Sequence, residues 1–205
     1  MDVRTQILTH ATRLFAEQGY DGTSVQQIAD AVGIRKPSLL YHFRSKDELR
    51  ERVIAEMLAH WNALLPSLLL HSTPEDRFDA TMKALSRFFI ADPDRARLIL
   101  RETLDRPEHM RVLLMEFVRP WITVLAEQLD RAKEQGTVRP DVDTEAYAVQ
   151  VIAMAVSGTA VIDTLQTILP DDPVRGTTRE RHVRELTRVA RSSLYTEQET
   201  EREHG

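Results

Sequence analysis

Basic, hydroxyl and aromatic side chains gather in one short stretch of this 205-residue chain. Of the eight Lys and Arg residues in positions 1–53, six lie between Arg35 and Arg52. The chain as a whole is acidic, with a formal net charge of -5, so only a local basic strip could hold a nucleic acid. Such side chains contact phosphates and base edges, and the stretch is therefore the first candidate for DNA binding.

Catalysis and metal binding find little support in the rest of the sequence. The chain has no cysteine, which excludes disulfides and thiolate metal ligands. Glu56 and His60 are four residues apart, a pair too common to indicate a metal site. We find no Ser/His/Asp signature, phosphate-binding glycine loop or HExxH motif. We expect no enzyme activity, cofactor or metal, and keep an all-helical enzyme with a cryptic site as an alternative.

Two short helices precede the basic stretch. Apolar residues at helical spacing predict a first helix that covers residues 7–15 and that Gly19 ends. Ser24 or Thr23 would be the N-cap of a second helix, whose inward residues are Val25, Ile28, Ala29 and Val32. Gly33 permits a tight turn after it at little steric cost.

A third helix carries the polar side chains of the basic stretch. Pro37 suits its first turn, where a missing N–H is no loss, and the helix is predicted from about Lys36 to Phe43. Two helices around a tight turn, over residues 24–43, predict a helix-turn-helix motif. In this motif the second helix presents short or polar side chains to base edges.

This part of the sequence resembles the TetR family of bacterial one-component repressors. The resemblance covers about Ile7 to Leu49, including the spacing from Phe15 and Gly19 to the last run. The runs that carry it are Thr23-Ser24-Val25, Ile28-Ala29, Ala31-Val32-Gly33-Ile34, Lys36-Pro37-Ser38-Leu39-Leu40-Tyr41-His42-Phe43 and Ser45-Lys46-Asp47-Glu48-Leu49. The rest of the chain shares only helix number and length with the family.

The resemblance implies which residues contact DNA. Lys36 and Gln26 would read base edges, because Lys can reach guanine and Gln can pair with adenine. Pro37 and Ser38 would lie deep in the major groove, with Arg35 pointing outward beside them. The residues that would hold phosphates are Thr23, Ser24, Tyr41, His42 and Lys46.

Leu40 is where this sequence departs from the family, which usually has Tyr at that position. Either Tyr41 supplies the phenolic contact, or Leu40 touches a thymine methyl group. Each assigned residue also has an ordinary structural alternative. These alternatives are solvated charges for Arg35 and Lys36, a core aromatic for Tyr41, solvent-facing side chains for Gln26 and His42, and a helix cap for Ser24.

Past the motif, the sequence predicts longer helices and an all-α fold of about nine helices. Ser45 would cap a helix over residues 46–65 that Pro66 stops. That helix would join a DNA-binding domain, residues 1–49, to a second helical domain, residues 50–205. The remaining predicted helices cover residues 73–91, 94–104, 106–135 with a bend or break at Pro120, 144–169 and 177–195.

The segment 146–169 is apolar or small on nearly all faces, so it must be buried on all sides. With the last helix it suggests a dimer through a four-helix arrangement, which the resemblance also implies. A central helix of a monomer is the alternative. The expected interface residues are Val151, Ala155, Gly158, Ile162, Val183, Leu186 and Ala190.

Aromatic and methionine residues on several helices of the second domain could surround an apolar ligand pocket. They are Trp61, Phe78, Met82, Phe88, Phe89, Met110, Met115, Phe117 and Trp121. Ordinary core packing is the alternative for each of them.

The expected function is that of a dimeric transcriptional regulator, most simply a repressor, whose residues 36–43 bind a palindromic operator. A small-molecule effector in the second domain would release it. A helical adaptor without DNA binding is the second alternative, and Arg35, Lys36 and Lys46 argue against it. The longest apolar stretch, residues 151–162, is too short to span a bilayer, and we recognise no signal peptide. We therefore expect a cytoplasmic protein without a membrane partner.

Overall fold

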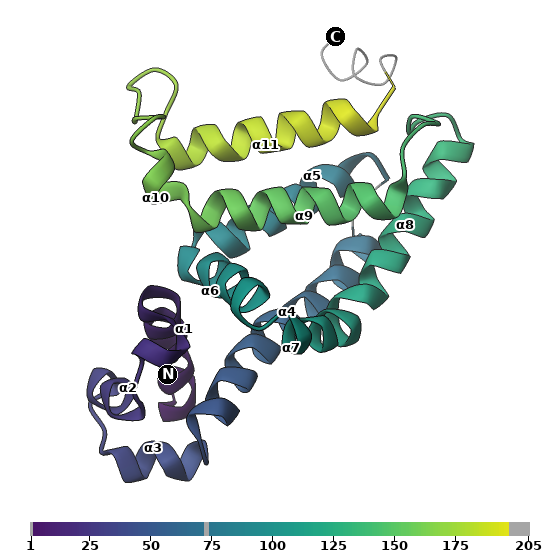
Figure 1. Ribbon diagram of the computed structural model, residues 1–205. Coiled ribbons are helices and arrows are strands. Elements are labelled where there is room, and N and C mark those ends of the chain that lie inside the picture. The colour runs from purple at the N-terminus through teal and green to yellow at the C-terminus, as the bar shows by residue number, and fades with distance from the viewer. Residues whose placement is uncertain (1, 72–73, 197–205) are drawn as a thin grey trace.

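The computed structural model describes the backbone of residues 2–71 and 74–196, and the side chains of residues 2–60 and 77–196. The described chain is all-helical, and its β-structure is limited to two isolated bridges, Val138 with Tyr195 and Asp172 with Gly176. Helices α1 (Val3–Gly22), α2 (Val25–Val32) and α3 (Lys36–His42) form one end of the molecule (Figure 1). These three helices confirm the predicted N-terminal module.

Helix α4 (Lys46–His71) leads from this module into the second domain (Figure 1). Asp47 and Glu48 in its first turn favour the helix dipole, as expected. The prediction that Pro66 ends the helix is wrong, because α4 continues to His71. A proline inside a helix removes one backbone hydrogen bond at a cost of about 3 kcal/mol, which does not by itself end a long helix.

Four helices and a π-helical segment follow α4 in the chain, and α5 and the π-helical segment pack against it. The helices are α5 (Pro74–Ile90), α6 (Pro93–Asp105), α7 (Pro107–Leu113) and α8 (Arg119–Glu134), with the π-helical segment, η1 (Leu114–Val118), between α7 and α8. The break predicted near Pro120 is confirmed, since this residue lies in the first turn of α8. The wide π turn precedes it, as is common where a helix must absorb an irregularity.

Helices α9 (Thr144–Ala160), α10 (Ile162–Leu165) and α11 (Thr178–Leu194) complete the fold, with α11 lying along α9 (Figure 1). The expectation of one helix over residues 144–169 is wrong. Val161 has φ -106° and ψ 13°, so the chain turns there. The turn buries Ile162 to 3% exposure. Hydrophobic periodicity could not locate this break, because the run is apolar on every face.

The hydrophobic core is continuous across both domains. It runs from Ile7 in α1, through Leu49 and Ile54 in α4, to Ala155 in α9 and Ala190 in α11. No helix in the described part of the chain is long and apolar enough to cross a membrane.

Candidate DNA-binding surface and effector domain

The turn between α2 and α3 depends on Gly33. This residue has φ 80° and ψ 27°, the left-handed conformation that glycine adopts without a Cβ penalty. Its N–H donates to the carbonyl of Asp30, which ends α2. Helix α3 then begins at Lys36 with proline in its first turn. Leu39 is fully buried and Phe43 is 2% exposed, so these two side chains fix which face of α3 turns toward solvent.

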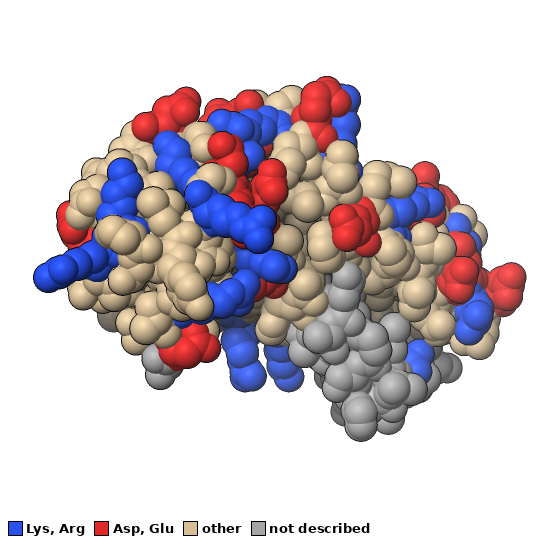
Figure 2. Space-filling view, turned by 90° about the horizontal axis from the view of Figure 1, so that it is seen from below, with Lys and Arg blue, Asp and Glu red and all other residues tan. Residues whose placement is uncertain are grey.

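The outward face of α3 holds most of the residues predicted to contact DNA. Tyr41 is 87% exposed and meets the His42 ring edge-on at 5.6 Å, which rules out a core position for this aromatic. Leu40 is half-buried at the side of the helix. Exposed neighbours on the same face are Arg35, Lys36, Pro37, Ser38 and His42. Figure 2 looks onto this end of the molecule, where blue basic side chains gather with red acidic ones between them.

Thr23 and Lys46 occupy structural positions that differ from the expected phosphate contacts. The Thr23 side chain is 1% exposed, and its hydroxyl donates to the carbonyls of Leu14 (3.1 Å) and Gly19 (2.8 Å). The Lys46 ammonium donates to the carbonyls of Tyr20 and Thr23, both at 2.8 Å. In this conformation the Thr23 hydroxyl cannot reach DNA, and two Lys46 hydrogen bonds hold the turn before α2 against α4.

The two polar residues predicted on α2 also have intramolecular partners. Ser24 forms a capping box with Gln27, in which its Oγ accepts from the Gln27 N–H at 3.1 Å and its own N–H donates to Gln27 Oε1 at 2.7 Å. Gln26 donates through Nε2 to Asp30 at 2.7 Å. A base contact from Gln26 would therefore exchange this exposed hydrogen bond for one to DNA.

Charged residues that connect the two domains were not singled out from the sequence. Arg50 on α4 and Glu102 on α6 form a buried ion pair, with Nη1 and Oε2 3.3 Å apart. Burial raises the pKa of Glu102, and the positive charges of Arg50 and Arg106 oppose that shift. The two residues are 52 positions apart, so no local pattern could have paired them.

Tyr20, at the end of α1, is surrounded by cations from the same region. Lys46 Nζ lies 4.0 Å from the centre of its ring, the Arg106 guanidinium 4.4 Å and the Arg50 guanidinium 4.9 Å. Each contact is attractive, because the face of an aromatic ring is negative. Burial and a hydrogen bond with Asp47 raise the pKa of the Tyr20 hydroxyl. This aromatic therefore joins α1, α4 and the start of α7.

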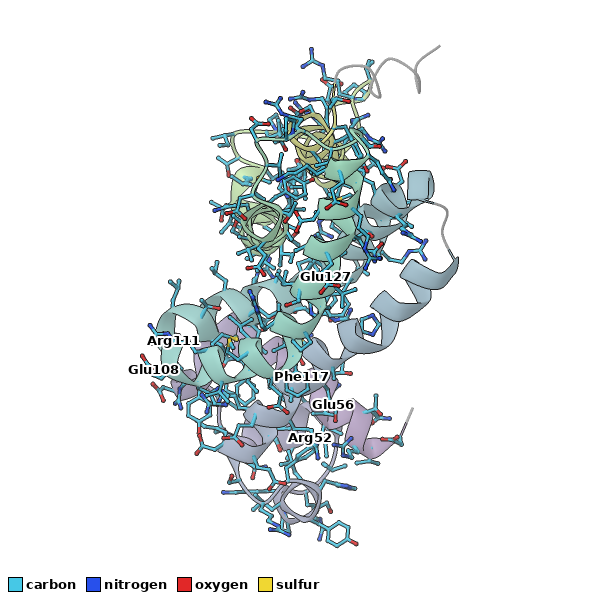
Figure 3. All side chains as sticks on the ribbon, turned by 90° about the vertical axis from the view of Figure 1, so that its right-hand side faces the viewer. Arg52, Glu56, Glu108, Arg111, Phe117 and Glu127 are labelled. Carbon is cyan, nitrogen blue, oxygen red and sulfur yellow. The ribbon has the colours of Figure 1, made fainter. Side chains whose placement is uncertain are left out.

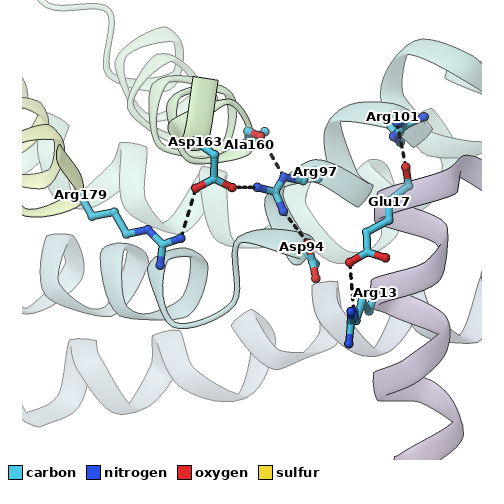
Figure 4. A network of polar contacts seen from close by, with 8 residues as sticks. All are labelled: Arg13, Glu17, Asp94, Arg97, Arg101, Ala160, Asp163 and Arg179. Atoms are coloured by element: carbon cyan, nitrogen blue, oxygen red, sulfur yellow. Dashed lines mark hydrogen bonds and ion pairs between the residues drawn. The ribbon is translucent and has the colours of Figure 1, made fainter. Parts of the chain in front are cut away.

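Helix α6 also contacts both ends of the molecule through arginines (Figure 4). Arg101 donates to the Glu17 carbonyl of α1 at 3.5 Å. One turn earlier, Arg97 pairs with Asp163 of α10 and donates to the Ala160 carbonyl at 3.3 Å. A displacement of α6 would act on the DNA-binding module and on the α9–α10 turn together.

Five of the seven residues expected at a dimer interface are buried within the single chain. Val151, Ala155, Ile162, Leu186 and Ala190 are at most 8% exposed. Gly158 and Val183 are half-buried. Other residues on α9 and α11 face outward. On α9 most of them are small or apolar: Ala146, Val149, Gln150, Ala153 and Ser157. On α11 most of them are charged, and the exposed residues there are Arg179, Glu180, Arg184, Glu185, Arg188, Val189, Ser192 and Ser193.

The residues expected around a ligand pocket lie on α5, α7, η1 and α8. Met82, Phe88, Phe89 and Met110 are buried, whereas Met115 is 65% exposed and points away from the interior. Phe78, Phe117 and Trp121 pack against the core with partial exposure. Along the long axis of the molecule in Figure 3, Phe117 lies between Glu127 and Glu56. The Trp61 side chain lies outside the described residues.

Among the buried polar atoms of these helices that have no hydrogen-bond partner in the described residues, two are ring nitrogens on α7 and α8. They are the indole Nε1 of Trp121 and Nδ1 of His109. Buried polar atoms are nearly always satisfied, so these two nitrogens are candidates for contact with a ligand. His109 also interacts electrostatically with the buried Glu102. His109 was not singled out from the sequence, where a lone histidine gives no signal. No group of three or more His, Cys, Asp or Glu that could hold a metal occurs in the described part of the chain.

Comparisons with known proteins agree with this arrangement. Residues 7–53 match the model of bacterial regulatory proteins of the tetR family, and residues 74–189 match the tetracyclin repressor-like C-terminal domain. The HTH-type transcriptional regulator LmrA of Bacillus subtilis is 34% identical over 150 residues, which cover 67% of this chain and 80% of LmrA. The HTH-type transcriptional repressor KstR2 of Rhodococcus jostii is 30% identical over 154 residues, 69% of this chain and 71% of that protein.

A solved structure shows the same fold over nearly the whole length. The ketosteroid transcriptional regulator KstR2 of Mycobacterium tuberculosis superposes with a TM-score of 0.70 at 20% identity, covering 96% of both chains. The two matched models divide the chain as the structure does, into the α1–α3 module with the start of α4 and the helices from α5 to α11. The chain belongs to the TetR family of helix-turn-helix transcriptional regulators and is a DNA-binding regulator rather than an enzyme.

Proposed function

We propose that this regulator is a cytoplasmic homodimeric repressor that places one α3 helix in the major groove at each half of a palindromic operator. The observation that carries the proposal is the outward face of α3, where Lys36, Ser38 and the 87% exposed Tyr41 stand on a helix anchored by Leu39 and Phe43. Two such helices would read half-sites about 34–36 Å apart, or at a somewhat wider spacing.

The roles of individual residues follow from their exposure and partners. Lys36 has no intramolecular ion pair among the described residues, so its ammonium is available for guanine. Tyr41, and not Leu40, is the exposed aromatic that would contact a phosphate or sugar. Ser24 and His42 would add phosphate contacts, whereas Lys46 would act mainly by holding the turn before α2 in place.

The dimer would form through the outward faces of α9 and α11. Val149 is 51% exposed and Val189 is 37% exposed, and the small residues on the outward side of α9, Ala146, Ala153 and Ser157, would let a partner helix approach closely. The buried residues first expected there, such as Ala155 and Leu186, would support these helices from within. Sedimentation should show a species of twice 23.5 kDa.

The effector would bind among the apolar side chains of α5, α7 and α8. The unpaired Trp121 Nε1 and His109 Nδ1 support this location, because a bound molecule could accept or supply their missing hydrogen bonds. Binding shifts the protein between conformations only as far as the effector's affinities for them differ. The contacts of α6 with α1 and α10 would carry that shift to α3.

Anisotropy titrations with a palindrome selected from a random DNA library test the DNA-binding proposal. We expect affinity to fall steeply with salt, because phosphate contacts release counterions. Lys36→Ala should weaken binding to the selected palindrome by about tenfold while binding to unrelated DNA changes less. Lys83→Ala, which removes an exposed lysine on α5, is the matched control and should bind like the wild type. Equal losses on both DNAs would assign Lys36 to a phosphate and overturn its base-reading role.

A further inference from the structure

A groove on the opposite end of the molecule from α3 has the composition of a second ligand site. It lies between the C-terminal half of α5, the α10–α11 loop and the first turns of α11, and its volume is about 640 Å³. Volumes of this size are typical of small-molecule sites. Figure 1 shows the α10–α11 loop far from α3, so the groove takes no part in the proposed operator contact.

Four arginines from three segments of the chain line the groove. They are Arg87 on α5, Arg175 in the loop, and Arg179 and Arg184 on α11. Arg87 and Arg175 have no carboxylate within ion-pair distance among the described residues. Arg179 shares Asp163 with Arg97, at 3.4 Å (Figure 4), and Arg184 donates to the Arg175 carbonyl. The guanidinium groups of Arg179 and Arg184 are therefore held in place, whereas those of Arg87 and Arg175 have no carboxylate partner among the described residues.

The acidic side chain in the lining offsets only part of this positive charge. Glu180 accepts from the N–H of Thr177 at 2.8 Å and from its hydroxyl at 3.0 Å, as part of the capping box that starts α11. These hydrogen bonds lower the pKa of Glu180, and they hold its carboxylate at the helix end. The groove keeps an excess of positive charge.

The rest of the lining is apolar with one unsatisfied hydroxyl. Ile90 and Val183 line the same groove and are half-buried, and Val174 in the lining is 92% exposed. Ser86 Oγ is buried without a hydrogen-bond partner among the described residues. Apolar side chains and several guanidinium groups in one groove favour a molecule with an apolar body and an acidic head, since arginine binds carboxylates and phosphates with paired hydrogen bonds.

We propose that this groove binds a small amphipathic anion, with its carboxylate or phosphate held by Arg87 and Arg175 and its apolar part on Ile90 and Val183. None of the residues assigned to the proposed effector pocket lines the groove. The groove is therefore separate from that pocket, and the proposal for it can be tested independently of operator binding.

Fluorescence titration with anilinonaphthalene sulfonate, an amphipathic anion, tests the proposal against its uncharged parent, phenylnaphthylamine. The Arg87→Gln/Arg175→Gln variant should bind the sulfonate about tenfold or more weakly, because two charge-assisted hydrogen bonds are lost. It should bind the uncharged probe as the wild type does. Arg111→Gln is the matched control, since Arg111 is an exposed arginine on α7 that pairs with Glu108 away from the groove (Figure 3). Equal sulfonate binding by the double variant and the wild type would overturn the proposal.

Competition then identifies the head group. Decanoate and decyl phosphate should displace the sulfonate probe from the wild type, and the stronger competitor shows whether a carboxylate or a phosphate is preferred. Decanol has the same apolar body without the charge, and equal displacement by decanol would refute a role for the arginines. The double variant should keep its affinity for the selected operator, which separates failure at this groove from failure of the proposed DNA binding.

Discussion

The buried ion pair between Arg50 and Glu102 gives a quantitative test of how the two domains are joined. Their side chains are 4% and 5% exposed, and Arg50 Nε has no hydrogen-bond partner among the described residues. Replacing Glu102 by leucine would leave the Arg50 charge in the interior. Asp47 lies 3.7 Å from Arg50 but is 60% exposed, so it compensates only in part.

The expected loss follows from the cost of an uncompensated buried charge. Breaking such a pair by removing one partner typically costs about 3–5 kcal/mol. For a chain of this length, 1 kcal/mol changes the melting temperature by about 2–4 °C, so Glu102→Leu should lower it by about 6–20 °C. The Arg50→Leu/Glu102→Leu double variant removes both charges and should recover most of this loss, because apolar groups of similar volume replace a buried pair at little cost.

Scanning calorimetry and urea unfolding of the two single variants and the double variant measure this coupling. Arg111→Leu is the control, since Arg111 and Glu108 form a pair whose side chains are 70% and 81% exposed, and its loss should cost less than about 1 kcal/mol. If Glu102→Leu melts within about 2 °C of the wild type, the pair is not desolvated in solution and the reasoning fails.

Four further changes test other parts of the structure. Gly158→Ala places a Cβ 2.2 Å from His182 Cε1, so melting curves should show a loss of about 1–3 kcal/mol of stability. Adding His182→Ala should restore that stability. A Gly158→Ala variant as stable as the wild type would contradict this close contact. Burial lowers the pKa of His182 below its ordinary 6.5, so the free energy of unfolding should fall as pH drops from about 6.5 through the folded pKa. His182→Asn should flatten this dependence of the unfolding free energy on pH. Equal slopes for the variant and the wild type would show that another group titrates. Tyr41→Ala should weaken operator binding about tenfold in anisotropy titrations and change stability by less than about 0.5 kcal/mol; unchanged affinity would remove Tyr41 from the interface. Thr23→Val should cost about 1–3 kcal/mol of stability but leave the salt slope of DNA binding unchanged, whereas a reduced slope would restore Thr23 as a phosphate contact.

Local signals were enough to predict the DNA-binding module. The cap at Ser24, the turn at Gly33 and the proline at position 37 each act through the backbone of their own neighbourhood, so the sequence places α2 and α3 to within about a residue. The same holds for the break near Pro120. These features depend on two to four consecutive residues and need no knowledge of distant contacts.

Features that depend on tertiary contacts could not be predicted in this way. The two hydrogen bonds of Lys46 could not be predicted because its carbonyl acceptors lie 23 and 26 positions earlier in the chain, and no pattern within α4 indicates them. Which residues of α9 face outward could not be predicted for a related reason. A helix that is apolar on every side does not reveal which side faces its own core, and only its packing against α5, α6, α8 and α11 decides it.

The core that runs without interruption from Ile7 to Ala190 also sets limits on exchanging parts between relatives. A chimera that joins the first 53 residues of this chain to the C-terminal helices of another regulator would keep Tyr20 and Arg50 but would receive foreign residues in place of Glu102 and Arg106. The recombined protein would then hold a buried arginine without its carboxylate and an aromatic without one of its cations. To exchange operator specificity, only the outward residues of α2 and α3 should be replaced. The side chains that pack behind them, in both domains, should all come from one parent protein.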